Sequence, residues 1–265
     1  MQKTILMTGA TDGIGLETAR MLVSLGHTVL LHGRNLAKLD NVEKTLSTNN
    51  GHVESYMADL SRMADVETLA KAVAGKHAKL DVLINNAGVY NAPDPVTQDG
   101  LDIRFAVNAI APYLLTQRLM PLMTASGRVI NLSSAAQSTV NLEALAGWVK
   151  LSDGVAYAQS KLAMTMWSRS LALSLKGNGP AVIAVNPGSM LGSKMVKQAF
   201  GVAGGDIRIG AEILTRAALS DEFATASGQY FDNDSGQFAS PHPDALNSQK
   251  SEELVGAIEA VLGKD

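Results

Sequence analysis

Short apolar runs alternate with longer amphipathic stretches along almost the whole chain. The runs that we interpret as strands are Thr4–Thr8, Thr28–His32, Val53–Met57, Val82–Asn85, Arg128–Leu132, Ala181–Val185 and Gln229–Phe231. Apolar residues recur at helical spacing in Ile14–Leu25, Leu36–Leu46, Val66–Ala74, Leu101–Leu119, Tyr157–Leu175 and Glu252–Leu262. This alternation predicts an α/β fold, in which a doubly wound, mostly parallel sheet of seven strands is covered by helices on both faces. We expect residues 1–265 to form a single domain.

Three irregular segments, approximately residues 90–99, 137–153 and 188–205, follow the fourth, fifth and sixth strands. In open α/β sheets the ligand crevice lies at the carboxyl ends of the strands. We therefore expect these loops to form the walls of a substrate-binding site.

Composition narrows the possible functions. The chain has 265 residues, of which 46% are hydrophobic and 18% charged, and it has no Cys, which excludes disulfides, thiolate metal sites and a Cys nucleophile. The formal net charge of -3 gives no electrostatic footprint for nucleic acid or an anionic membrane. The sequence shows no signal peptide and no apolar run of roughly 18 residues, so we expect a cytoplasmic protein. The His residues lack metal-ligand spacing, and we expect no metal.

The first strand runs into a glycine-rich turn, Thr8–Gly15, that leads directly into a helix. Glycines at this spacing let the backbone approach a pyrophosphate, and the free N–H groups at the helix start attract the anion. The alternative is a tight turn without a ligand, but the surrounding α/β pattern favours dinucleotide binding.

Arg34 follows the second strand, where NAD-selective sites usually carry an acidic residue. The position itself is Gly33, and the Arg34 guanidinium can pair with a 2′-phosphate. This predicts a preference for NADP (NADPH) over NAD. The alternative is that Arg34 is only a solvated loop cation, and Asp12 in the glycine turn counts against the preference.

Tyr157 and Lys161 lie four residues apart in a predicted helix and therefore on one face of it. A nearby ammonium favours the phenolate, which would make Tyr157 a general acid/base near neutral pH. A Tyr–Lys pair at this spacing is common by chance. It therefore indicates a catalytic pair only when the surrounding sequence supports that interpretation.

That context resembles the short-chain dehydrogenase/reductase family, and in particular its retinol-dehydrogenase-like branch. The family's motifs occur in order over nearly the whole chain: TGxxxGxG at Thr8–Gly15, Asp59-Leu60, Asn85-Asn86-Ala87-Gly88, Asn108, Ser134, Tyr157 with Lys161, and Pro187-Gly188. The resemblance implies a Rossmann-type fold and an oxidoreductase that interconverts a carbonyl (aldehyde or ketone) and an alcohol with NAD(P).

The resemblance also implies roles for the matched residues. Tyr157 would exchange a proton with the substrate oxygen, and Ser134 would hydrogen-bond that oxygen. Lys161 would bind the nicotinamide ribose and lower the pKa of Tyr157, and Asn108 would hold a water in a proton relay. Ser134 is preferred over Ser133 because the family's catalytic serine is usually the second of such a pair, and neighbouring strand residues point oppositely. The implied cofactor-binding residues are Gly9, Thr11, Asp12, Gly13, Ile14, Gly15, Arg34, Asp59, Leu60, Asn86, Ala87, Gly88, Tyr157, Lys161, Pro187, Gly188 and Ser193.

The chain departs from the family's pattern in two places. The interval from Ser134 to Tyr157 is longer than in compact members, and its extra segment is either a substrate lid or an inert surface elaboration. The Thr that often follows Pro-Gly and binds the carboxamide is absent, and Ser193 is the candidate to replace it.

Other classes of function remain open at this stage. A non-catalytic dinucleotide-binding regulator would not need the Tyr–Lys pair, and an NAD-dependent epimerase or dehydratase would need a larger region after the sixth strand. We expect a small-molecule substrate and a homodimer or homotetramer, because related enzymes often pair through the helices that correspond to Leu101–Leu119 and Tyr157–Leu175.

Overall fold

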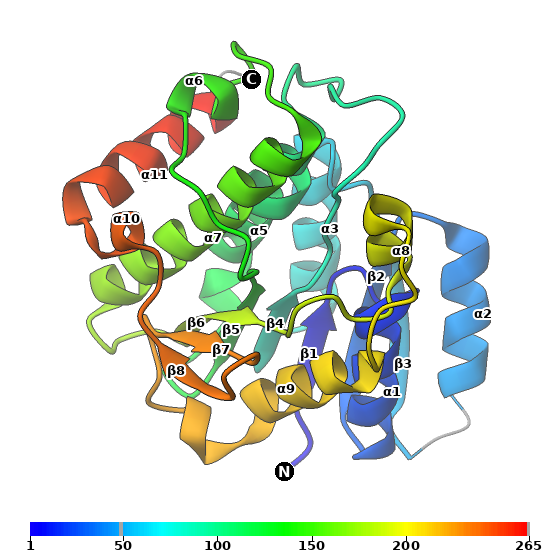
Figure 1. The fold of residues 1–265 in the computed structure, drawn as a ribbon. Helices are drawn as coiled ribbons and strands as arrows, with labels where there is room; N and C mark the ends of the chain where they lie inside the picture. The colour runs from blue at the N-terminus through cyan, green and yellow to red at the C-terminus, as the bar shows by residue number, and fades with distance from the viewer. Residues whose placement is uncertain (48–49, 264–265) are drawn as a thin grey trace.

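The computed structural model describes residues 1–47 and 50–263 and contains a sheet of eight strands in the order β3-β2-β1-β4-β5-β6-β7-β8 (Figure 1). The strands are β1 (Thr4–Met7), β2 (Thr28–Gly33), β3 (His52–Met57), β4 (Val82–Asn85), β5 (Arg128–Leu132), β6 (Ala181–Asn186), β7 (Tyr230–Asp232) and β8 (Gln237–Ala239). All neighbours pair in parallel except β7 and β8, which are antiparallel. The predicted doubly wound α/β class is confirmed, with one strand more than expected.

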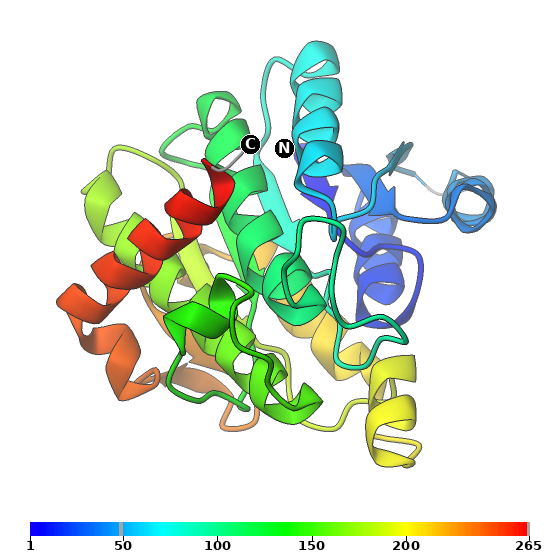
Figure 2. The same ribbon diagram turned by 90° about the horizontal axis from the view of Figure 1, so that it is seen from above.

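Helices cover both faces of this sheet, as Figures 1 and 2 show. Helices α1 (Gly13–Ser24), α2 (Leu36–Leu46) and α9 (Ile207–Leu219) pack on one face, and α3 (Met63–Lys76), α5 (Ala111–Leu119) and α7 (Asp153–Leu175) pack on the other. The shorter helices are α4 (Ile103–Phe105), α6 (Leu142–Leu145), α8 (Lys194–Phe200) and α10 (Pro243–Leu246). The last helix, α11 (Ser248–Leu262), lies outside α7.

The central strands are buried on both sides, which explains their continuous apolar sequence. In β4, Val82 and Ile84 belong to the core on the α1 and α9 side, and Leu83 to the core on the α3 and α5 side. None of the three is exposed to solvent. Parallel strands in a covered sheet require this pattern.

The helix expected over Leu101–Leu119 is divided in the structure. Asp102 caps α4 by accepting a hydrogen bond from the Arg104 N–H (2.8 Å), and a π-helical turn, Ala106–Ile110, connects α4 to α5. Pro112 has no N–H, so the donor that would normally bond the Asn108 carbonyl in an α-helix is missing. The divided helix therefore places a π turn at one of the predicted catalytic residues.

The short elements β8, α6, α8 and α10 were not predicted from the sequence. The longer helix α9 was not predicted either. Gly210 interrupts the apolar pattern of α9 in its first turn. A Cβ at Gly210 would lie 2.8 Å from Leu191 Cδ1 and 3.1 Å from Ile14 Cδ1, so the glycine allows α9 to pack closely on α1.

Helix α11 packs on α7 and reaches Tyr113 of α5. Leu254 and Ile258 are fully buried there, and the Tyr113 hydroxyl of α5 donates to Glu259 Oε1 (2.8 Å). The chain's own last helix therefore takes part of the α7 surface, one of the two helices through which we expected two chains to pair. Among the described residues, no helix combines the length and apolarity needed to cross a membrane.

Candidate functional site

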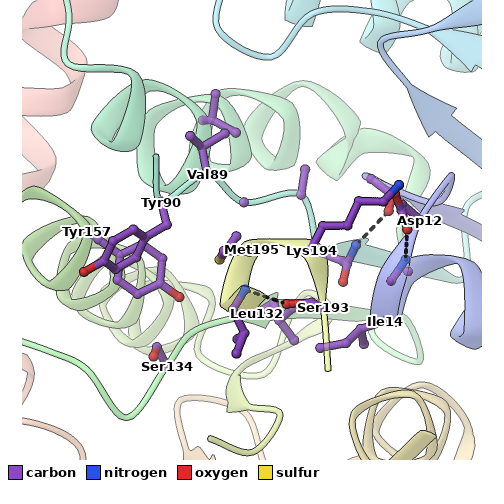
Figure 3. A pocket seen from close by; sticks show the side chains of 18 of the residues that line it. Asp12, Ile14, Val89, Tyr90, Leu132, Ser134, Tyr157, Ser193, Lys194 and Met195 are labelled. Atoms are coloured by element: carbon purple, nitrogen blue, oxygen red, sulfur yellow. Dashed lines mark hydrogen bonds and ion pairs between the residues drawn. The ribbon is translucent and has the colours of Figure 1, made fainter. Parts of the chain in front are cut away.

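A cleft of ≈ 910 Å³ lies at the carboxyl ends of the parallel strands, between the glycine-rich turn, the strand ends and α8 (Figure 3). Every predicted cofactor-binding residue lines this cleft, and so do Ser134, Tyr157 and Lys161. Asn108 is the one predicted site residue that does not line it. The strand–helix topology thus collects motifs that are far apart in the sequence.

The glycine-rich turn is packed too tightly for side chains. Gly9 and Gly13 have positive φ angles of 66° and 57°. A Cβ at Gly15 would lie 2.1 Å from the Gly9 carbonyl oxygen, and a Cβ at Gly9 would lie 2.9 Å from Ala87 Cα. Gly9 and Gly15 therefore keep the backbone beside the start of α1 free of side chains, as close approach of a pyrophosphate requires.

Two side chains, the partly buried Asn86 and the buried His32, hold this turn in place. The Asn86 amide donates to the carbonyl oxygens of Thr8 (2.9 Å) and Gly9 (3.0 Å). His32 Nδ1 accepts from the Gly9 N–H (3.3 Å), while its Nε2 donates to the Ala58 carbonyl (3.1 Å). Burial lowers the pKa of His32 to about 4, so the ring is neutral at pH 7 and fits this structural role.

Two cations lie on the edge of the cleft, Arg34 directly after β2 and Lys38 in the first turn of α2. Arg34 and Lys38 are exposed, lie about one helical turn apart, and line the cleft. A Cβ at Gly33 would lie 2.7 Å from Thr11 Cγ2, so a side chain at the position that holds an acidic residue in NAD-selective sites would require Thr11 to move. Lys38 was not singled out from the sequence, although its spacing from Arg34 could have revealed it.

Ser134 and Ser133 point in opposite directions after β5, as strand alternation predicts. The Ser133 hydroxyl is buried and bonds Thr165 Oγ1 (2.6 Å). Ser134 is partly exposed in the cleft, and its hydroxyl shares a hydrogen bond with the Tyr157 phenol. The geometry therefore favours Ser134 as the serine that can reach a substrate.

Tyr157 and Lys161 lie on successive turns of α7, with the Lys161 Nζ 5.7 Å from the centre of the Tyr157 ring. Burial raises the pKa of Tyr157 above its usual value, against the opposite effect of its hydrogen bond with Ser134. Burial also lowers the pKa of Lys161 to about 8, and its ammonium donates to the Leu132 carbonyl (2.7 Å). The structure thus lacks the lowered Tyr157 pKa that we expected from Lys161, because burial of the phenol dominates.

Asn108 lies behind the cleft rather than in its wall. Its amide nitrogen donates to the Val89 carbonyl (2.9 Å) and to Ser160 Oγ (3.0 Å), and its Oδ1 accepts from the Val89 N–H (2.8 Å). The side chain therefore fixes the loop after β4, and only the Asn108 backbone carbonyl is left without its usual helical donor.

The cleft has an aromatic side that was not predicted residue by residue. The Tyr90 ring stacks on Tyr157, with centroids 4.9 Å apart, and on Phe200 of α8, with centroids 5.4 Å apart. Figure 3 shows Tyr90 and Tyr157 ring against ring above Ser134. Tyr90 lies two residues after the Asn85–Gly88 motif and is not part of any motif, so the sequence analysis did not single it out.

The segment 137–153 does not form the expected wall. Its candidate lid residues Leu142, Leu145, Trp148 and Val149 are outside the lining, and Gly147 packs so closely that a Cβ would lie 2.4 Å from the Gly100 carbonyl. The described structure therefore favours the surface elaboration over the lid. The other two expected segments do line the cleft, through residues 90–93 and through residues 188–191 and 193 together with α8.

Ser193 has a local structural task in addition to its place in the cleft. Its Oγ caps α8 by accepting from the Val196 N–H (3.2 Å), and its Cβ lies 3.9 Å from where a Cβ on Gly13 would stand. Ser193 therefore lies beside the glycine-rich turn. Next to it, Lys194 forms an ion pair with Asp12.

A doubly wound sheet with a glycine-lined groove beside a Tyr–Lys pair defines the class of dinucleotide-dependent oxidoreductases of the Rossmann type. Residues 3–201 match the family model of short chain dehydrogenases, and the chain belongs to that family.

Curated relatives are similar over almost the whole chain. Human retinol dehydrogenase 13 is 31% identical over 98% of this chain and 85% of its own length. Bovine (Bos taurus) retinol dehydrogenase 12 is 33% identical over 98% of this chain and 86% of its own length. Human polyprenol dehydrogenase is 35% identical over 70% of this chain and 60% of its own length.

Solved structures show the same fold. An uncharacterised protein of Mycobacterium paratuberculosis has a TM-score of 0.82 at 27% identity, covering 98% of this chain and 93% of that one. The Pseudomonas aeruginosa protein RhlG, solved with NADP in its active site, has a TM-score of 0.72 at 26% identity. The match covers 88% of this chain and 95% of that one. The chain is thus an oxidoreductase of the short-chain dehydrogenase family.

Proposed function

We propose that this protein is an NADP(H)-preferring oxidoreductase that interconverts a carbonyl and an alcohol, with Tyr157 as general acid/base. The observation that carries the proposal is that Tyr157, Ser134 and Lys161 share one cleft with the glycine-rich turn. When bound, the nicotinamide supplies or accepts the hydride. The chain's own residues then have to orient the substrate and move one proton.

The raised pKa of Tyr157 suits the reductive direction, because the phenol stays protonated and can donate its proton to the substrate oxygen. Ser134 donates a hydrogen bond to the same oxygen and aligns it. The buried Lys161 ammonium holds the ribose hydroxyls, and the Asn108 carbonyl binds the water that returns a proton to the site.

The Tyr157 assignment is tested with reduced nicotinamide and a panel of aldehydes and ketones, following the loss of absorbance. Tyr157→Phe is expected to lower kcat by about 100-fold or more while NADPH binding is retained, since general acid catalysis contributes about that much. Ser134→Ala should lower kcat as well, whereas Ser133→Ala, whose hydroxyl points into the interior, is the matched control. Full activity of Tyr157→Phe would show the proton transfer to be wrong. Tight NADPH binding without turnover of any carbonyl would instead favour a non-catalytic regulator.

The NADP preference rests on the cations Arg34 and Lys38, which line the cleft, and on Gly33 standing where NAD-selective sites carry an acidic residue. NADP-bound structures among the similar proteins support it. Loss of a charged phosphate contact typically weakens binding about tenfold or more, so Arg34→Ala should weaken NADPH binding by about tenfold and leave NADH binding nearly unchanged. Equal losses for both nucleotides in a fluorescence titration would contradict the assignment.

The substrate is proposed to be an apolar aldehyde, ketone or alcohol. The substrate end of the cleft is lined by Val89, Tyr90, Met195 and Phe200, and the relatives named above are retinol and polyprenol dehydrogenases. The panel should therefore compare long apolar aldehydes with small charged ones, and kcat/KM should favour the apolar members.

Assembly into a homodimer or homotetramer stays a prediction. Because α11 packs on α7 and bonds Tyr113 of α5, we infer that any such assembly uses another surface.

A further inference from the structure

Asp12 takes up hydrogen-bonding groups that a bound phosphate would need. Its Oδ1 accepts from the N–H of Gly13 (2.9 Å), the first residue of α1, where free N–H groups normally attract an anion. Its Oδ2 accepts from the Lys194 ammonium. Both side chains line the cleft, and Figure 3 shows Lys194 reaching from α8 to Asp12.

The ion pair between Lys194 and Asp12 can be broken at small cost in free energy. The Lys194 and Asp12 side chains are 69% and 45% exposed, and exposed ion pairs contribute little stability. No residue of α8 is buried, so the helix that carries Lys194 can shift at small cost. Although partial burial raises the pKa of Asp12, the bond with Lys194 and the nearby Lys38 bring it below its usual value, so the carboxylate is charged at pH 7.

A second negative charge beside this carboxylate would be repelled. A nucleotide pyrophosphate that enters the glycine-rich turn therefore has to displace Asp12 or lose affinity to it. The displaced carboxylate leaves behind the Gly13 N–H and the Lys194 ammonium, both of which suit a phosphate oxygen.

We propose that Asp12 is a placeholder for the nucleotide pyrophosphate, and that Lys194 is a phosphate-binding residue which exchanges Asp12 for that phosphate. The proposal rests on the nucleotide binding proposed above and adds a residue to it. Since the pyrophosphate is common to both nucleotides, Lys194 serves NADH and NADPH alike, in contrast to Arg34 at the 2′-phosphate end.

The experiment measures dissociation constants of NADH and NADPH by fluorescence titration for the whole protein and for Lys194→Met, Asp12→Asn and the double variant. Lys194→Met is expected to weaken both nucleotides by about fivefold, the size expected for one partly screened charge contact. Asp12→Asn should tighten both by about threefold, because it removes the charge that repels the phosphate and that holds Lys194. Lys197→Met is the matched control, since Lys197 is exposed on the same helix but outside the cleft lining. Thermal melting without nucleotide checks that each variant is folded.

The double variant distinguishes two roles for Lys194, namely contact with the phosphate and mere neutralisation of the Asp12 charge. If Lys194 contacts the phosphate, Lys194→Met weakens binding at least as much in the Asp12→Asn background as in the original one. The proposal is overturned if that loss disappears in the Asp12→Asn background, if Asp12→Asn does not tighten binding, or if the loss is confined to NADPH. Failure of the unaltered protein to bind either nucleotide would instead refute the proposed function itself.

Discussion

At the scale of single residues, Lys161 is placed at a cost to stability. Its ammonium is buried and has the Leu132 carbonyl as its hydrogen-bond partner, and burial lowers its pKa from 10.5 to about 8. The folded protein therefore binds a proton at Lys161 less well than the unfolded chain does. Such a penalty is typical of residues kept for function rather than for stability.

We predict that Lys161→Met abolishes activity and raises the free energy of unfolding at pH 7. The pKa shift corresponds to about 3 kcal/mol, and loss of the bond to Leu132 offsets about 1 kcal/mol, which leaves a gain of about 2 kcal/mol. The unfolded chain binds more protons between about pH 8 and 10.5, so the penalty is complete below about pH 8 and vanishes as the pH rises to 10.5. Urea unfolding at pH 7 and 10 checks this. A gain that grows with pH would contradict it.

The same scale shows which site residues could be predicted from the sequence. Ser134 could be separated from Ser133 because strand alternation is a property of every strand. Tyr90 and Lys194 lie in segments that were predicted to line the site, but the two residues could not be singled out, because which side chains of these segments face the cleft depends on tertiary packing. The pKa of Tyr157 was also beyond the sequence, since it depends on how deeply the ring is buried.

At the scale of elements, Arg104 connects the two helices that carry the predicted catalytic residues. It is 1% exposed, donates to both carboxylate oxygens of Asp102 (2.8 and 2.6 Å), and bonds Asp153 at the start of α7 (2.7 Å). Asp102 begins the segment that leads to Asn108, and Asp153 begins the helix with Tyr157 and Lys161. The guanidinium fork thus fixes one helix start against the other.

Replacing Arg104 should loosen this junction. We expect Arg104→Met to lower the free energy of unfolding by about 3 kcal/mol, because it leaves the partly buried Asp102 without its partner. Arg104→Lys keeps the positive charge but not the forked guanidinium. Its free energy of unfolding should therefore lie between those of Arg104→Met and the unaltered protein. Denaturant unfolding measures both variants, and Asp153→Asn, whose side chain is 53% exposed, is the control with a small expected effect. Equal stability of Arg104→Met and the unaltered protein would show that the Arg104 guanidinium does not stabilise the junction between α4 and α7.

Element boundaries followed from the sequence wherever the apolar period was regular. Helix α2 lies over the predicted residues Leu36–Leu46, and β4 and β5 also match their predicted ranges. The prediction was wrong for the continuous helix over 101–119, because the Asp102 cap and the π turn around Asn108 are not visible as apolar spacing. β8 was missed because it is short and lies at the edge of the sheet, where one-sided burial gives a weak pattern.

At the scale of the whole molecule, the doubly wound sheet could be predicted because each central strand must be apolar on both faces. What the sequence could not show is which surface helix covers which neighbour. The segment Glu252–Leu262 was predicted to be helical, but its docking on α7 follows only from the structure. That docking changes the expectation for assembly more than any other feature.

We predict that the protein forms no dimer through α5 and α7 as long as α11 is in place. Trp167 and Tyr113 are buried beneath it, so two chains could meet there only if α11 detached and exposed Leu254 and Ile258. The variant Leu254→Ala with Ile258→Ala should lose at least about 4 kcal/mol of stability by the usual cost of such truncations, and should self-associate as its concentration rises. Glu252→Ala, on the exposed side of the same helix, is the control. Light scattering after size-exclusion chromatography gives the mass against the 27.8 kDa chain, and hydrogen exchange locates any contact surface. Protection of α5 and α7 that depends on protein concentration, with α11 still folded, would show that the chains pair there after all.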